Sequence, residues 1–190
     1  MRRIVLSAAL AVALAAPAYA ATPVEKPVKL LIGAVRYGKD SLALTGLDGD
    51  AQGRVLLGDE WAKATPKERS EFTRLFQELF AAMAFPKLRA DLVHLDTTLY
   101  QPPQVTGDHA ELDSTLVILH PLAKQEIKVR YDLHKQKGAW KVVDVSVLGT
   151  GDPSMLTGIR DQQVRPIFKD GGWDKLLSLM RARLAQVKKQ

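Results

Sequence analysis

The sequence has no cysteine among its 190 residues. Disulfide bonds, cysteine-ligated zinc, iron–sulfur clusters and thiol catalysis are therefore excluded, as is a lipoprotein anchor, which is attached through a cysteine. Long apolar runs are also scarce. The longest, Ile4 to Ala16, is broken only by Ser7 and is shorter than the ~20 residues that a membrane-spanning helix needs. We therefore expect no segment that spans a membrane.

The N-terminus has the composition of a secretory signal peptide. Met1-Arg2-Arg3 is a basic start, the apolar run follows it, and Ala18-Tyr19-Ala20 matches the small-x-small pattern that signal peptidase cleaves. We predict a signal peptide over residues 1–20 and a single exported domain over residues 21–190, free in the periplasm of a Gram-negative cell. The net charge of +6 includes Arg2 and Arg3, so the domain is only mildly basic and is not expected to bind nucleic acid.

Helical spacing of apolar residues dominates the first third of the domain. It predicts helices over 24–37 and 54–64, with a loop at 38–53 between them. Thr65-Pro66-Lys67-Glu68 has the residues of a helix N-cap. The helix that begins there should end near Phe85, because a proline at position 86 disfavours helical geometry in the residue before it.

The middle of the domain changes to an alternating pattern, which predicts strands over 92–100, 109–119, 125–134 and 139–148. The last of these is apolar on both faces, so we expect it to be central in the sheet. Helical spacing returns over 154–169 and 172–187, on either side of Gly171-Gly172. The predicted fold class is α+β, with an antiparallel sheet of about four strands between two sets of helices.

The polar residues give no strong metal or phosphate motif. Asp48 to Asp59 partly imitates a calcium loop, but Asp59 stands where the longer Glu normally binds the ion, and we favour a solvated loop leading into a helix. No histidine pair has the spacing of a helical metal site, and no glycine-rich phosphate loop occurs. No metal or cofactor is expected. The histidines lie in or beside the predicted strands; they are His94, His109, His120 and His134.

Asp144 interrupts an otherwise apolar strand and has two interpretations. A buried carboxylate can have a raised pKa and act as a general base. Alternatively, it accepts hydrogen bonds from neighbouring backbone or from a side chain such as Arg160. We favour the structural role, and because no nucleophile-elbow motif occurs either, we expect no catalytic residue.

The helix after Thr65 carries a pronounced apolar stripe. A stripe of this kind is usually core, yet several apolar faces together can also enclose a cavity. Composition alone leaves both alternatives open. The stripe consists of Phe72, Leu75, Phe76, Leu79, Phe80 and Met83.

Several motifs together resemble the MlaC family, also called toluene-tolerance proteins. Leu57-Gly58-Asp59-Glu60-Trp61, Thr65 to Arg69 and Phe72 to Phe76 are similar to its helical front. Trp140 to Val145 is similar to its penultimate motif, and Arg160 to Val164, followed by Gly172 and Leu176-Leu177, to its C-terminal helices. The resemblance covers most of residues 24–187. It departs where Gly149 to Ser154 is longer than the family pattern and Gly158-Ile159 replaces Asn-Tyr.

The resemblance implies a soluble periplasmic phospholipid carrier. Such carriers shuttle lipid between an outer-membrane lipoprotein complex and an inner-membrane ABC transporter with its MCE-domain ring. It also implies an NTF2-like sheet wrapped by helices around an apolar pocket for the acyl tails. The physical need is clear, because each buried CH₂ contributes about 0.8 kcal/mol and a 16-carbon chain therefore about 12 kcal/mol. The alternatives are an NTF2-like enzyme that uses Asp144 as a base and an exported protein-interaction module.

Two sets of site residues follow from this hypothesis. Four cations on or beside the C-terminal helices are the expected partner-docking residues: Arg160, Arg165, Lys169 and Arg181. Apolar side chains from the helices and the sheet are the expected lipid-binding residues: Leu31, Trp61, Phe72, Leu75, Phe76, Leu79, Phe80, Met83, Val129, Tyr131, Leu133, Val142, Ile159 and Ile167.

Overall fold

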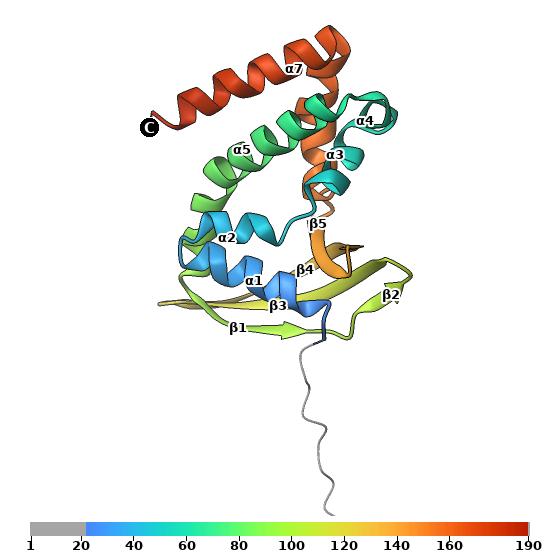
Figure 1. Ribbon diagram of the computed structural model, residues 1–190. Helices are drawn as coiled ribbons and strands as arrows, with labels where there is room; N and C mark the ends of the chain where they lie inside the picture. The colour runs from blue at the N-terminus through green and yellow to red at the C-terminus, as the bar shows by residue number, and fades with distance from the viewer. Residues whose placement is uncertain (1–21, 190) are drawn as a thin grey trace, which may run out of the picture.

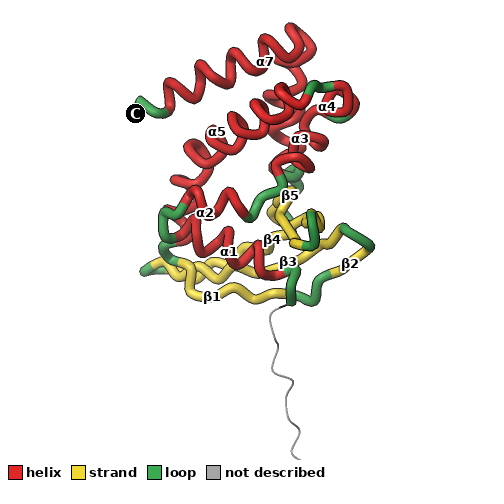
Figure 2. The backbone as a smooth tube through the Cα atoms, in the orientation of Figure 1, coloured by secondary structure: helices red, strands yellow, loops and turns green. Residues whose placement is uncertain are grey.

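The computed structural model describes residues 22–189, so the predicted signal peptide lies outside the described residues. Helices and strands form separate layers, with the helices stacked over one face of a single antiparallel sheet (Figures 1 and 2). This confirms the predicted α+β class. Among the described residues, no helix combines the length and the apolar content that crossing a bilayer requires.

The chain order is five helices, five strands and a final helical run. The first helices are α1 (Glu25–Arg36), α2 (Asp40–Thr45), α3 (Gly49–Leu57), α4 (Asp59–Lys63) and α5 (Pro66–Leu92). The strands are β1 (Leu95–Tyr100), β2 (Gln104–Thr106), β3 (His109–His120), β4 (Ala123–Gln136) and β5 (Ala139–Val147). The final run is α6 (Met155–Ile159), the π-helical turn η1 (Arg160–Val164) and α7 (Arg165–Val187).

The segment expected to be a loop at 38–53 is instead mostly helical, because α2 and the first turn of α3 lie in it. Asp48 explains the start of α3. Its Oδ1 accepts the backbone N–H of Ala51 at 3.0 Å, which satisfies one of the free donors at a helix N-terminus. The Asp and Gly residues that resembled a loop are therefore a helix cap and its first turn.

Helix α5 begins as predicted and ends later than predicted. Thr65 and Glu68 form a reciprocal capping box, which confirms the expected N-terminus. Pro86 does not end the helix, which continues to Leu92. A proline inside a helix removes one hydrogen bond and costs about 3 kcal/mol. Burial of Phe85 and Leu92 in the core on either side of Pro86 offsets that cost.

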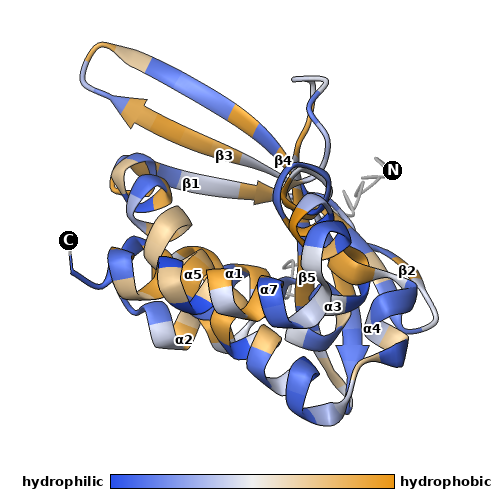
Figure 3. Cartoon of the chain, turned by 90° about the horizontal axis from the view of Figure 1, so that it is seen from above, coloured by the Kyte–Doolittle hydropathy of each residue, from blue (hydrophilic) through white to orange (hydrophobic). Residues whose placement is uncertain are grey.

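The sheet has five strands rather than about four, in the order β1-β3-β4-β5 with β2 also paired to β3. The sequence analysis missed β2, because its three residues are all exposed and carry no alternation. Strands β3 and β4 pair along their whole lengths, from His109 opposite His134 to His120 opposite Ala123. The turn end of this hairpin projects beyond the helices (Figure 3).

The expectation that the strand at 139–148 is central is wrong, since β5 lies at the edge of the sheet. Both of its faces are nevertheless covered. The register shifts at Val143, so that Val142 packs in the core beside the sheet while Val143 packs against the core between the helices. The edge itself is partly paired: Asp48 N–H donates to the Val142 carbonyl at 2.9 Å, and Val142 N–H donates to that of Gly46 at 2.8 Å.

The buried apolar residues form three groups. The sheet core lies between α1 and the strands and comprises Val24, Val28, Leu47, Ala110, Leu112, Val129, Tyr131, Leu133 and Val142. The rear core, around the end of α5, comprises Ala34, Val35, Ala43, Ala81, Phe85, Leu92, Leu95 and Ile118. The helical core comprises Leu56, Leu57, Trp61, Phe72, Leu75, Phe76, Leu156, Val164, Leu176, Leu177, Met180 and Leu184.

Candidate functional site

A continuous series of aromatic rings begins at Trp61 of α4 and runs along one face of α5. The ring of Trp61 lies 5.6 Å from that of Phe72, which stacks on Phe76 at 5.9 Å. Phe76 stacks on Phe80 at 6.1 Å, and Phe80 meets Phe85 edge-on at 5.5 Å. These separations lie within the range of favourable aromatic pairs. We call these five residues the aromatic series. It runs from the helical core to the rear core.

The predicted lipid-binding residues fall into two groups rather than one. The members in or against the helical core are Trp61, Phe72, Leu75, Phe76, Leu79, Ile159 and Ile167. The members in or against the sheet core are Leu31, Phe80, Val129, Tyr131, Leu133 and Val142. The contact between Phe76 and Phe80 joins the two groups. Met83 lies outside both groups and is 43% exposed.

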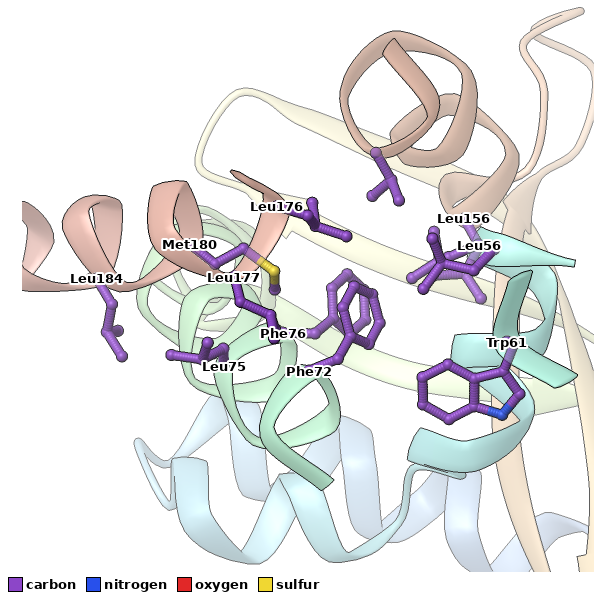
Figure 4. Packing of buried hydrophobic residues seen from close by; sticks show 12 residues of the cluster. Leu56, Trp61, Phe72, Leu75, Phe76, Leu156, Leu176, Leu177, Met180 and Leu184 are labelled. Atoms are coloured by element: carbon purple, nitrogen blue, oxygen red, sulfur yellow. The ribbon is translucent and has the colours of Figure 1, made fainter. Parts of the chain in front are cut away.

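The helical core is covered by residues 173–187, which we call the C-terminal segment. The chain breaks from helical geometry just before it, at Gly171 and at Gly172, whose φ of 59° is in the left-handed region that favours glycine. This confirms the predicted separation of the two last helices. Beyond the break, Leu176, Leu177 and Met180 point toward Phe72 and Phe76 of α5 (Figure 4).

Two ion pairs fasten the C-terminal segment to α5. Arg181 donates to Glu71 at 2.7 Å, and Lys188, just past the end of α7, donates to Glu78 at 2.7 Å. From the first ion pair to the second, the acidic residue and the basic residue each advance by seven positions in the sequence. The C-terminal segment therefore runs parallel to α5. The Arg181 guanidinium holds the pKa of the Glu71 carboxyl below its ordinary value, and Lys188 and Arg74 do the same for Glu78. Neither glutamate was predicted from the sequence, although the matched seven-residue spacing is visible in it.

The four predicted docking residues have different surroundings. Arg160 and Arg165 both contact Asp161, at 2.8 Å and 3.4 Å. Lys169 is exposed near the end of the first part of α7. Arg181 is engaged with Glu71 and so belongs to the contact between α5 and the C-terminal segment.

Asp144 is buried and its Oδ1 is hydrogen-bonded to backbone. It accepts the N–H of Val145 at 2.7 Å and that of Leu156, at the start of α6, at 2.9 Å. Leu156 is fully buried in the helical core. Asp144 therefore joins the sheet to the helices. Asp132 of β4 lies opposite Asp144 in the strand ladder. Burial of Asp132, together with the nearby charge of Asp144, raises the pKa of Asp132.

A second buried aspartate ties α3 to the sheet. Besides capping α3, Asp48 places its Oδ2 2.9 Å from Nδ1 of His134 on β4. The ring of His109 lies 5.1 Å from that of His134. The sequence analysis assigned Asp48 to a possible calcium loop and missed this contact, because the two residues are far apart in the chain.

The chain matches the family model described as MlaC protein over residues 40–182, well over half of its length. The chain belongs to the MlaC family. The fold of this MlaC-family chain also has relatives among solved structures. One is described as the phospholipid-binding protein from Ralstonia solanacearum in complex with a phospholipid. It aligns with a TM-score of 0.67 and 20% identity over 87% of this chain and 97% of that chain, which shows a shared fold.

A second solved structure, an Rd1NTF2 variant, aligns with a TM-score of 0.40 and 13% identity over 65% of this chain and 94% of that chain. No curated protein matches the chain. Gly149 to Ser154 lie in the connection between β5 and α6. Gly149 and Gly151 adopt left-handed φ values of 86° and 78°, and Ser154 caps α6 by accepting the N–H of Thr157 at 3.3 Å.

Proposed function

We propose that this MlaC-family chain is a periplasmic phospholipid carrier that moves lipid between an outer-membrane lipoprotein complex and an inner-membrane ABC transporter. Membership in the family supports this proposal, and the Ralstonia relative, described with a phospholipid, supports the class of ligand. The observation that carries it is the aromatic series, an unbroken line of apolar ring contacts from one core of the protein to another.

In this proposal the acyl chains lie along α5, beside Phe72, Phe76 and Phe80, where the helical core meets the sheet core. These side chains are packed against each other and, in the helical core, against the C-terminal segment. A lipid must therefore displace part of that packing. The displacement is feasible because acyl carbons replace the apolar contacts that the segment gives up, at about 0.8 kcal/mol for each CH₂ removed from water.

The C-terminal segment is the part proposed to move. It has a glycine break at its base, and its ion pairs are at the protein surface. Exposed ion pairs contribute little to stability and are screened by salt. The segment can therefore separate from α5 without disrupting the strand ladder of the sheet.

Docking to the two membrane complexes is proposed to depend on Arg160, Arg165 and Lys169, which lie together on η1 and the first part of α7. Charges at the rim of an interface mainly raise the rate of encounter, and this effect declines with ionic strength. Transfer of lipid to a partner complex should therefore slow as salt increases. A transfer rate that is equal at low and high salt would count against charge-dependent docking.

No second function is favoured by a specific observation, since Oδ1 of Asp144 already accepts two backbone hydrogen bonds. The carrier proposal is tested by native mass spectrometry of the purified protein, followed by organic extraction. We expect a species heavier by one diacyl phospholipid, and the same lipid in the extract. Protein that is free of lipid after gentle purification, and that takes none from vesicles, would contradict the proposal.

A further inference from the structure

Arg69, on the first turns of α5, is held in place by neutral groups. Its guanidinium lies over the ring of Trp61, 5.9 Å from the centroid, and its Nη2 donates to the Ala62 carbonyl at 2.7 Å. Trp61 is itself fixed, because Gly53 of α3 lets the indole pack directly on the helix; a Cβ at position 53 would lie 2.5 Å from the ring. Arg69 is therefore preorganised without a carboxylate partner.

The carboxylates near Arg69 are already paired with other cations. Asp50 pairs with Arg54 and accepts the indole N–H of Trp61 at 3.2 Å. Glu78 is bound by Arg74 and by Lys188, each at 2.7 Å. Among the described residues Arg69 makes no ion pair, and its Nε is buried without a hydrogen-bond acceptor. Arg69 is therefore a cation that no carboxylate of the described residues neutralises.

Two surface hollows meet at Arg69. Both are open to solvent; the larger has a volume of about 570 Å³ and the smaller about 390 Å³. The larger is lined by Leu44, Asp50, Arg69, Ser70, Thr73, Arg74, Gln77 and Glu78. The smaller is lined by Arg54, Gly58, Trp61, Ala62 and Arg69.

We propose that these two hollows form a binding site for a phosphate group, with Arg69 as its central ligand. A guanidinium carries five donors in a planar fork that matches phosphate oxygens, and Arg69 uses one of them on Ala62. Ser70 and Thr73 add hydroxyl donors along the same face of α5. Asp50 and Glu78, which also line the larger hollow, are neutralised by the cations already described.

The phosphate comes either from a phospholipid headgroup or from a small phosphate ester. The first source rests on the proposed function. The larger hollow and the proposed acyl site share helix α5, on which Thr73 and Gln77 line the hollow while Phe72 and Phe76 belong to the aromatic series. The second source requires only the hollows and is independent of lipid transport.

The test compares delipidated wild-type protein, Arg69→Gln and a matched control, Arg183→Gln, whose exposed side chain contacts Gln186 on α7. Inorganic phosphate, glycerol 3-phosphate and anionic diacyl phospholipid in vesicles are the three probes. Binding is followed by the indole resonance of Trp61, assigned with Trp61→Phe. We expect Arg69→Gln to weaken binding of at least one probe by about tenfold or more, and Arg183→Gln to leave it unchanged. Arg69→Lys should bind at an intermediate level, which separates loss of the site from loss of the fold.

Loss of binding for the two water-soluble probes as well as the lipid identifies a general phosphate site. Loss for the lipid alone identifies a headgroup site. If Arg69→Gln binds all three probes as the wild type does, or if no probe moves the Trp61 resonance, the proposal is wrong. That result would leave the carrier proposal intact wherever the wild-type protein still co-purifies with phospholipid. Conversely, phosphate binding by a protein that never carries lipid would support this site and contradict the carrier.

Discussion

The sheet core and the helical core are both apolar, but they are closed in different ways. The sheet core is closed by continuous strand pairing, with β3 and β4 hydrogen-bonded along their whole lengths. Arg130 of β4 reinforces this pairing through two hydrogen bonds to Asp113 of β3, at 2.8 Å and 2.9 Å. Opening the sheet core would break many backbone hydrogen bonds at once, so this half of the molecule is the fixed scaffold.

The helical core is closed largely by one segment that follows a glycine break. The C-terminal segment contributes Leu176, Leu177, Met180 and Leu184, and no strand ladder holds it in place. Among the described residues, the polar contacts that hold it to α5 are the Arg181–Glu71 ion pair and, just past its end, the Lys188–Glu78 ion pair. Local opening has a low cost where few backbone hydrogen bonds to the rest of the protein are broken. The same apolar composition therefore builds a scaffold on one side and, in the proposed mechanism, a cover that can open on the other.

The largest expected effect comes from a charge placed in the aromatic series. Phe76→Asp puts a carboxylate between the stacked rings of Phe72 and Phe80, at a cost of several kcal/mol unless the group is neutralised. Co-purified lipid should fall sharply while secretion continues. Met83→Asp, on the same helix but 43% exposed, should retain lipid. A folded Phe76→Asp protein with normal lipid content would show that the series is ordinary core.

The sequence predicted the local features of both halves better than their arrangement. The alternation in β4 and the Thr65–Glu68 cap are encoded within a few residues, and both were predicted. Pro86 predicted an end that α5 does not have, because burial of Phe85 and Leu92 outweighs the local preference. The double-sided apolar pattern of β5 was read as a central strand, whereas it reflects Val142 and Val143 packing in different cores.

The candidate site was predictable only in part. The stripe on α5 is visible in the sequence, and its aromatic members stack as a series in the fold. Which core each apolar residue joins depends on tertiary packing that no local pattern encodes. Arg69 gave no signal, because its role depends on the position of Trp61 and on which neighbouring carboxylates are already paired.

A smaller effect is expected where the two cores are joined, at Asp144. Asp144→Asn weakens the hydrogen bonds to Val145 and Leu156 and should cost about 1–3 kcal/mol of stability. The folded fraction should still hold lipid, because the carboxylate is structural. Urea unfolding and lipid extraction measure the two properties separately. A variant with normal stability that loses turnover of a small ester or carbonyl compound would instead favour an enzyme.

Asp132 lies opposite Asp144 in the strand ladder, and its substitution by Asn should change stability in the opposite direction. Its pKa is raised by burial and by Asp144, so its charged form is disfavoured in the folded protein. A carboxyl of this kind lowers stability at neutral pH and ceases to do so once acid protonates it. Asp132→Asn should therefore raise the midpoint of thermal unfolding at pH 7. A lowered midpoint would show that the charge of Asp132 makes a favourable contact.

The smallest expected effect is that of low pH on the two ion pairs that hold the C-terminal segment to α5. The pKa values of Glu71 and Glu78 are lowered from 4.5 by Arg181 and Lys188. A carboxyl with a lowered pKa contributes fully above its ordinary value and loses that contribution as the pH falls below it. Release of a fluorescent lipid should therefore accelerate below about pH 4.5, by less than about tenfold because exposed ion pairs are weak.

Glu71→Gln combined with Glu78→Gln should remove this acid dependence, and Asp113→Asn in the sheet should preserve it. Asp113 is the matched control because its pKa is also lowered by an arginine, Arg130, but its ion pair lies within the scaffold. A release rate that depends on pH in the same way in both variants would contradict the role assigned to the two glutamates.

The most direct measurement of the central claim is a pair of crosslinks, which the absence of native cysteine makes possible. Glu71→Cys with Arg181→Cys, joined by a cleavable bis-thiol reagent, fixes the C-terminal segment to α5. Asp113→Cys with Arg130→Cys, joined in the same way, fixes β3 to β4. Lipid exchange with vesicles is then measured before and after cleavage of each link. The account predicts that the first crosslink stops exchange, that cleavage restores it, and that the second crosslink changes nothing. Exchange that persists with the segment fixed, or that stops only when the strands are joined, would contradict it.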